Sequence, residues 1–307
     1  MRVALRALAL LLPLCSALPC PAQSGFRVTL LGTGNPRPEL ERFGPSILVE
    51  AGDRALLVDC GRGAAQRLFQ LDVPFARVES ILLTHLHSDH VVGLPDFWLT
   101  GWLFGRARPL EIIGPKGTRD MVRHLERAYA FDVRIRQADE GLPAAGARLE
   151  AREVGEGLVF DRGGVRVTAF RVDHGPVSPA LGYRVEYAGR VVVFSGDTRP
   201  SENLVKFAQG ADVLVHEVLA LELERRRALV APSAIDRIIA HHTTAEDAGK
   251  IFARVRPRLA VFSHIVPSVA TESDVLPDAR KHYDGPMVMG KDLMRIVVGE
   301  KIQWTSE

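Results

Sequence analysis

The chain has 307 residues, of which 47% are hydrophobic and 25% are charged, and its formal net charge is +2 at pH 7. This composition is that of a globular protein long enough to bury a large core, and it excludes a disordered or fibrous chain. The nearly balanced charge also lacks the strongly basic footprint of a general nucleic-acid-binding protein.

The first 22 residues have the layout of a secretory signal peptide. Arg2 and Arg6 accompany an apolar stretch, which Pro13 interrupts before small residues lead to Ala22. The stretch is shorter than the roughly 20 residues that a membrane span needs. We therefore expect residues 1–22 to be cleaved after Ala22, which would leave a periplasmic or secreted protein without a stable membrane anchor. A retained, uncleaved anchor is the alternative.

Cleavage would leave a single domain, residues 23–307, because no repeat, low-complexity tract or long linker interrupts the rest of the chain. The removed segment contains two arginines and no acidic residue, so the mature chain would be formally neutral. It also contains two of the three cysteines, which leaves Cys60 alone and excludes an intramolecular disulfide. Cys60 ends an apolar run, and we expect it to be a buried, inert thiol.

Apolar runs that favour β-strands alternate with amphipathic stretches along the mature chain. The β-favouring runs cover residues 26–32, 45–51, 54–60, 80–85, 110–114, 165–172, 181–187, 190–196, 211–217 and 259–264. The helical stretches cover residues 63–71, 96–106, 117–131, 201–209 and 243–255. Strands of mixed spacing with helices between them predict an α/β fold in which two β-sheets pack back to back with helices outside.

Residues 85–90 read HLHSDH and follow one of the β-favouring runs. Imidazole nitrogen and carboxylate oxygen are donors that suit Zn²⁺, Mn²⁺ or iron, and crowding four such side chains into one turn is unfavourable unless a cation offsets it. His85 and His87 can project together, whereas Asp89 and His90 turn toward a second position. The motif therefore predicts metal binding and indicates two adjacent ions.

Three further donors follow apolar runs elsewhere in the chain. His174, Asp197 and His264 each stand at or just after the end of a β-favouring run. Binding sites are built where strands end, so we expect these side chains to meet the histidine motif at one edge of a sheet. The carboxylate of Asp197 is suited to bridge two cations.

The order of these motifs resembles that of the metallo-β-lactamase superfamily, in the branch that contains ribonuclease Z and related arylsulfatases. The resemblance covers nearly all of the mature chain and rests on LGTGNPRP, VDCGRGAAQ, THLHSDHVVGLP, IIGPKGT, DHGPVSPALGY, SGDT, ADVLVHE, HHTTAEDAG and SHI. It implies the four-layer αββα sandwich of that superfamily, with two mixed sheets inside and helices outside. It also implies a homodimer.

The resemblance further implies a set of ligands for two divalent ions. Zinc fits the donor types best, and iron and manganese are the alternatives. Carried over position by position, one ion would be held by His85, His87 and His174, the other by Asp89, His90 and His264, and both by Asp197. A hydroxide that bridges the ions would attack a phosphodiester or a sulfate ester.

The same branch assigns the remaining catalytic step to a histidine and a glutamate. Here they correspond to His242 in HTTAEDAG and Glu217 in LVHEV. We expect His242, oriented by Glu217, to protonate the leaving group, and we count Asp89 among the catalytic residues together with this pair.

The chain departs from ribonuclease Z at two places that bear on the substrate. A long arm that clamps transfer RNA would fall between His174 and Asp197, where this sequence has only a short hairpin. The arginine-tyrosine pair expected after SHI is replaced by Val266 and Pro267. Together with the export signal, these departures favour a small-molecule or short ester substrate over RNA.

Two other functions stay open at this stage. The same metal site could open a lactone or β-lactam ring, since a bridging hydroxide also attacks carbonyl carbon; the His242 and Glu217 pair favours an ester instead. A metal-binding scaffold without turnover is the second alternative, although such proteins usually lose ligands and this sequence keeps the full set.

Trp98 and Trp102 stand four residues apart just after the histidine motif, on a predicted helix. Aromatic residues at this spacing usually pack a helix against its sheet. The alternative hypothesis is that they form an aromatic wall over the metals, which would favour substrates with an aryl leaving group.

Overall fold

The computed structural model describes residues 25–227 and 231–305. The predicted signal peptide and its cleavage site after Ala22 lie outside the described residues. None of the described helices is both long enough and apolar enough to cross a membrane.

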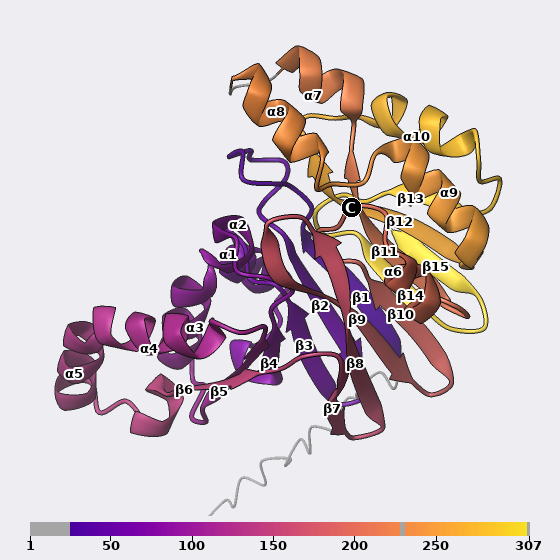
Figure 1. Ribbon diagram of the computed structural model, residues 1–307. Coiled ribbons are helices and arrows are strands. Elements are labelled where there is room, and N and C mark those ends of the chain that lie inside the picture. The colour runs from indigo at the N-terminus through magenta and orange to yellow at the C-terminus, as the bar shows by residue number, and fades with distance from the viewer. Residues whose placement is uncertain (1–24, 228–230, 306–307) are drawn as a thin grey trace, which may run out of the picture.

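Two mixed β-sheets form the centre of the molecule (Figure 1). The 8-stranded sheet has the order β15-β14-β1-β2-β3-β4-β5-β6 and consists of β1 (Phe26–Gly32), β2 (Ser46–Ala51), β3 (Arg54–Val58), β4 (Val78–Leu82), β5 (Leu110–Gly114), β6 (Leu149–Glu153), β14 (Arg295–Val298) and β15 (Ile302–Thr305). The 7-stranded sheet has the order β13-β12-β11-β10-β9-β8-β7 and consists of β7 (Gly157–Arg162), β8 (Val165–His174), β9 (Val177–Tyr187), β10 (Arg190–Phe194), β11 (Val213–Leu219), β12 (Leu259–Val266) and β13 (Met287–Met289).

Helices cover the outer face of each sheet. The 8-stranded sheet carries α1 (Ala64–Gln70), α2 (Ser88–Val91), α3 (Leu94–Leu103), α4 (Thr118–Ala128) and α5 (Ala130–Asp139), with 3₁₀ turns at Phe75–Arg77 and Ala144–Ala147. The 7-stranded sheet carries α6 (Glu202–Phe207), α9 (Ala245–Val255) and α10 (Glu272–Arg280), and the pair α7 (Leu221–Arg227) and α8 (Pro232–Ile239) stands at its edge. The expected αββα sandwich is confirmed.

Alternation along the strands explains why the central runs are apolar throughout. In β3, Leu56 and Val58 join the core between the two sheets, whereas Ala55 and Leu57 pack beneath the outer helices. In β11, Leu214 likewise faces the helices while its neighbours face the other sheet. Successive side chains of a strand point to opposite faces, so a strand covered on both faces needs apolar residues at every position.

Both tryptophans of α3 point into the protein, and Trp98 belongs to the outer core of the 8-stranded sheet. Trp98 and Trp102 are buried, and their indole nitrogens donate to the carbonyl oxygens of Ala147 and Pro143 at 3.2 and 3.0 Å. Neither lines the pocket at the metal motif. The packing interpretation is confirmed, and the hypothesis of an aromatic wall over the metals is wrong.

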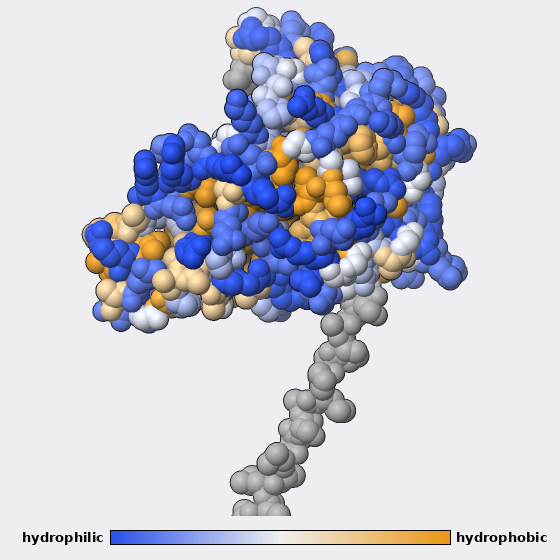
Figure 2. Space-filling view, turned by 60° about the horizontal axis from the view of Figure 1, so that its bottom comes forward, coloured by the Kyte–Doolittle hydropathy of each residue, from blue (hydrophilic) through white to orange (hydrophobic). Residues whose placement is uncertain are grey.

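Helices α4 and α5 project from the body as a lobe (Figure 1). The sequence predicted one helix over residues 117–131, but Tyr129 has the non-helical angles φ −101° and ψ 7° and separates the two. Phe131 and Ile135 of α5 are exposed. Figure 2 shows hydrophobic side chains on this lobe and others near the middle of the same face, among hydrophilic surroundings.

Strand direction places the functional side chains together. Strands β3, β4 and β5 run parallel to one another, as do β10, β11 and β12. Their carboxyl ends meet at one edge of the sandwich, which is where ligands bind in sheets of this kind. The predicted metal ligands all follow or end strands at this edge.

Candidate metal centre

The turn after β4 presents the HLHSDH motif at the edge of the sandwich. His85 and His87 lie in the loop before α2, and Asp89 and His90 lie in the first turn of α2. All of these side chains except that of His87 are buried. The short segment therefore sends its donors in two directions, as its spacing predicted.

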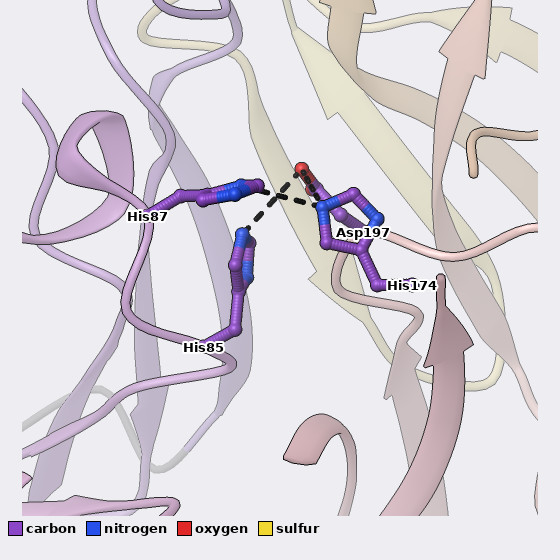
Figure 3. Close-up of side chains that lie close together, drawn as sticks. All are labelled: His85, His87, His174 and Asp197. Carbon is purple, nitrogen blue, oxygen red and sulfur yellow. Dashed lines mark hydrogen bonds and ion pairs between the residues drawn. The ribbon is translucent and has the colours of Figure 1, made fainter. Parts of the chain in front are cut away.

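The first group of donors combines His85 and His87 with His174 and Asp197. One ligand atom from each lies within 4.8 Å of the others. The Nε2 atom of His174 is 3.3 Å from Nδ1 of His87, and Nε2 of His85 is 3.8 Å from Oδ2 of Asp197 (Figure 3). These residues come from three separate segments, and their side chains converge on one point.

The second group combines Asp89 and His90 with His264. The Nε2 atom of His264 is 3.3 Å from Oδ2 of Asp89 and 3.2 Å from Oδ2 of Asp197. The Nε2 atom of His90 is 3.3 Å from the same Asp197 oxygen. Asp197 therefore stands between the two groups, in the position expected of a bridging carboxylate.

A bulge in β12 directs His264 into this group. Glu217 and Val218 of β11 pair with Ser263 and Ile265, so His264 is the extra residue, and its φ is 42°. A bulge of this kind turns a side chain out of the regular alternation. The strained backbone is thus located where it aims an imidazole at the centre.

Burial and charge at the centre fit a cation. His85 Nε2, His90 Nε2 and Asp197 Oδ1 are buried, and they have no hydrogen-bond partner among the described residues. Burial lowers the pKa of His174 to about 4 and that of His85 well below 6.5, which leaves neutral imidazoles, the form that binds metal. Burial alone would raise the pKa of Asp197, but His264 and His90 hold it well below its usual range. The donor set of imidazole and carboxylate suits zinc.

Asp59 supports this centre, although no role was predicted for it from the sequence. Its Oδ2 atom lies 2.7 Å from Nδ1 of His90, and its carboxylate also accepts hydrogen bonds from the backbone N–H and hydroxyl of Thr84 at 2.8 Å each. Its φ of 58° lies in the left-handed region. Fixing Nδ1 of His90 leaves Nε2 free to face the metals. The signal in the sequence was an aspartate directly after the buried run of β3.

His242 and Glu217 form a second unit beside the candidate metal ligands. Nδ1 of His242 lies 3.0 Å from each carboxylate oxygen of Glu217, which also accepts from the backbone N–H groups of Thr198 and Thr243 at 2.9 and 3.3 Å. Burial lowers the pKa of His242, but the Glu217 carboxylate outweighs this and raises it to about 9. The raised pKa favours the protonated form of His242, which lies next to the candidate metal ligands.

His241 contributes through its backbone as well as its ring. Its carbonyl oxygen lies 3.0 Å from Nδ1 of His174, which turns Nε2 of His174 toward the centre. Its side chain lines the pocket. His216 is fully buried behind the centre, with Nδ1 2.7 Å from the carbonyl oxygen of Glu217.

A pocket of about 390 Å³ opens directly onto the centre. Its floor contains His87, Asp89, Asp197, His242 and His264. Its walls come from segments without predicted roles: the loop Asn35 to Pro38, Val266 and Pro267 at the end of β12, and the α7–α8 pair through Glu224, Arg227 and Ile238. The volume lies at the low end of the roughly 300–1,000 Å³ typical of ligand pockets.

Comparison with known proteins identifies the family. The sequence pattern described as Beta-lactamase superfamily domain matches residues 54–265. The ribonuclease Z of Mycolicibacterium gilvum is 38% identical over 281 residues, which cover 89% of this chain and 96% of that protein. The chain belongs to the ribonuclease Z branch of the metallo-β-lactamase superfamily.

Other members of this superfamily agree with that placement. The ribonuclease Z of Mycobacterium marinum is 37% identical over 278 residues, covering 89% of this chain and 99% of that one. The fold is also that of the metallo-β-lactamase fold protein YhfI from Bacillus subtilis, with a TM-score of 0.69, 19% identity and coverage of 88% and 98%. Human tRNase Z, short form, has a TM-score of 0.66 at 23% identity, with coverage of 89% and 99%.

Membership in the ribonuclease Z branch makes this protein a metal-dependent hydrolase that acts on ester bonds. The two His/Asp groups described above are candidate sites for divalent metal, and His242 also belongs to two further groups that could hold an ion, one with His174 and His241 and one with Asp197 and His264. The assignment of individual ligands to two zinc ions, and the roles of Asp89, Glu217 and His242, stay predictions that the geometry accommodates.

Proposed function

We propose that this protein hydrolyses phosphodiester bonds of RNA at a centre of two zinc ions. The observation that carries the proposal is the placement of the His242 and Glu217 pair beside a complete set of candidate ligands, with Nδ1 of His242 3.0 Å from both Glu217 oxygens. The extent of the similarity to proteins named ribonuclease Z supports RNA as the substrate.

The chemistry divides between the ions and the protein. Two bound zinc ions would supply an activated water and would stabilise charge on the phosphate oxygens. Asp197 would hold the two ions in register, because its Oδ2 atom lies within 4 Å of His85, His90, His174 and His264. His242 would donate its proton to the leaving oxygen, and Glu217 would keep that imidazole charged and oriented.

The short hairpin between β9 and β10 does not count against RNA. In the sequence analysis, its lack of a long arm favoured a small ester. The 281-residue match covers 96% of the Mycolicibacterium gilvum ribonuclease Z and 89% of this chain, so neither protein contains a long arm that the other lacks. RNA therefore replaces the small ester as the proposed substrate.

Substrate comparison tests this function. The protein would be purified without its first 22 residues, loaded with zinc, and assayed on an RNA with a single-stranded 3′ extension, bis(p-nitrophenyl) phosphate, p-nitrophenyl sulfate, a lactone and nitrocefin. We expect cleavage of the two phosphodiesters and none of the others. Turnover of only the sulfate, or of only the ring substrates, would replace the proposed substrate class. Bound metal without any turnover would favour a scaffold.

We also propose that the protein is exported and forms a homodimer. Residues 1–22 support export by their sequence alone, and the branch resemblance supports the dimer. Fractionation of the expressing cells and N-terminal sequencing would test cleavage after Ala22, and light scattering after size-exclusion chromatography would test the dimer.

A further inference from the structure

The pocket over the metal centre has one charged wall that the proposed chemistry does not use. Glu224 of α7 and Arg37 of the β1–β2 loop both line the pocket, on the side of α7 and α8. Figure 1 shows that loop reaching toward α8 at the top of the molecule. Neither residue belongs to the candidate ligand groups.

A buried hydrogen-bond network holds the part of the β1–β2 loop that carries Arg37. The side chain of Asn35 is buried; its Oδ1 atom accepts from the hydroxyl of Ser268 at 2.5 Å and from the backbone N–H of Arg37 at 3.1 Å. The backbone N–H of Asn35 in turn donates to the Ser268 hydroxyl at 3.2 Å. This network joins the loop to the segment that follows β12. Pro36 and Pro38 restrict the backbone on either side of Arg37.

Packing of Leu223, the residue before Glu224, fixes the position of Glu224 on α7. Leu223 is buried and packs into the outer core of the 7-stranded sheet, and the backbone N–H of Glu224 donates to Ala220 at 2.9 Å. The carboxylate of Glu224 is partly buried and makes no hydrogen bond or ion pair within residues 25–227 and 231–305. Burial raises its pKa, while the charges of Arg37 and His242 act in the opposite direction.

The Glu224 carboxylate, which has no partner among the described residues, would weaken binding of an anion that carries no hydrogen-bond donor. A phosphodiester brings its own negative charge to the metals, and a nearby carboxylate repels it unless the substrate also carries a hydrogen-bond donor. A partly buried carboxylate without a partner loses hydration and gains when such a donor arrives. Arg227 adds a further positive charge to the walls, and Pro36, Pro38 and Ile238 contribute apolar atoms that fit the flat faces of a nucleoside.

We propose that this pocket is a subsite for one nucleoside, in which Glu224 accepts hydrogen bonds from the ribose hydroxyls. Arg37, which pairs with Glu39 at 3.3 Å, partly offsets the charge of Glu224 and would lie near the phosphate that joins this nucleoside to the chain. The proposal rests on the proposed phosphodiesterase function and adds a selection for ribose over sugars without hydroxyls. Glu224 is thus a specificity-determining residue rather than a part of the metal chemistry.

A matched pair of substrates tests the subsite. Uridine 5′-(p-nitrophenyl phosphate) and its 2′,3′-dideoxy analogue differ only in the hydroxyls, and both release p-nitrophenol. For the zinc-loaded protein we expect kcat/KM to be about 10- to 100-fold higher for the ribose compound, the range for hydrogen bonds to a charged group. Glu224→Ala should abolish this preference by lowering kcat/KM for the ribose compound while the dideoxy compound is unaffected or improves.

Controls separate the subsite from general damage. Glu222→Ala changes the same residue type on the same helix, at an exposed position that does not line the pocket, and should keep the preference. Glu224→Gln retains an oxygen acceptor and should keep part of it. Metal content and melting temperature would be measured for every variant.

The possible results test the nucleoside subsite separately from the proposed phosphodiesterase activity. Equal turnover of the two compounds by the unmodified protein, or an equal loss on both in Glu224→Ala, would overturn the subsite and leave the phosphodiesterase intact. Failure of the metal-loaded protein to cleave either compound or bis(p-nitrophenyl) phosphate would overturn both proposals.

Discussion

Nδ1 of His242 lies 3.0 Å from both carboxylate oxygens of Glu217, and both side chains are almost completely buried. Two backbone N–H groups bond the same carboxylate, so Glu217 is fixed before it orients the imidazole. The ring of His242 in turn stacks 5.6 Å from that of His264. A charged histidine is therefore held rigidly beside a candidate metal ligand.

The loss of kcat caused by removing His242 should depend on whether the leaving group needs a proton. A general acid contributes about 10²- to 10⁴-fold where the leaving oxygen needs a proton, and much less where it does not. We expect His242→Ala to lower kcat by that factor on RNA, and by less than about tenfold on bis(p-nitrophenyl) phosphate, because p-nitrophenolate leaves unprotonated. The measurement is kcat on both substrates at equal metal content.

His282→Ala provides the control for this comparison. His282 is exposed and contacts Glu246, away from the pocket, so its removal should leave both rates unchanged. An equal loss on both substrates in His242→Ala would contradict proton donation and would assign His242 to metal binding or to folding.

Asp197 should be required for the metals as well as for turnover. Among the residues that the structure describes, its Oδ2 atom is the one carboxylate oxygen within 4 Å of histidines from both groups of donors. We expect Asp197→Ala to reduce bound zinc and to bring activity to background, and we expect chelation of the unmodified protein to do the same, with recovery on adding zinc. Zinc content by mass spectrometry of metals and hydrolysis of bis(p-nitrophenyl) phosphate are the measurements. Full zinc content in the variant would remove the bridging assignment.

Much of this centre could be predicted because its donors are local or end strands. The HLHSDH turn is a single segment, and His174, Asp197 and His264 follow runs whose apolar character is visible in the sequence. The alternation that buries both faces of β3 and β11 also made the strands recognisable.

The rest depends on tertiary geometry that no local pattern encodes. The bulge that aims His264 exists only in the pairing of β11 with β12. The break between α4 and α5 at Tyr129 could not be predicted, because no glycine or proline marks it in the sequence. Neither the helices α7 and α8 nor their position was predicted from the sequence. These two helices and the Asn35 to Pro38 loop form the pocket walls.

Asp59 should matter through His90 rather than through the metals directly. Residues that orient a metal-binding histidine typically change metal affinity by about 10- to 100-fold when altered. We expect Asp59→Asn to lower zinc affinity by this factor. Asparagine tolerates the left-handed backbone at this position, so the variant tests the lost charge rather than a strained turn.

Competition with a zinc chelator would measure this affinity. Asp53→Asn, in the exposed β2–β3 turn, is the matched control and should bind zinc like the unmodified protein. Unchanged affinity in Asp59→Asn would mean that the hydrogen bond of 2.7 Å to His90 does not tune the centre.

Gly93, three residues after the histidine motif, should be required for packing of the motif against the Asp59 turn. A Cβ atom at this position would lie 2.0 Å from the carbonyl oxygen of Gly61 and 2.9 Å from that of Cys60. Both contacts are with backbone, which cannot rotate away, and the N–H of Gly93 donates to the Cys60 carbonyl at 3.0 Å. We expect Gly93→Ala to destabilise the fold by about 1–3 kcal/mol, the usual range for overpacking.

Thermal unfolding would check this, with Gly155→Ala as control. A Cβ atom at Gly155 would meet nothing within 4 Å, and its backbone is not left-handed, so that variant should melt like the unmodified protein. For a domain of this size, a loss of 1 kcal/mol lowers the melting temperature by roughly 2–4 °C. Equal melting temperatures for the two variants would show that the Gly61 segment can move away from α2, and the histidine motif would then be less rigidly seated than its contacts indicate.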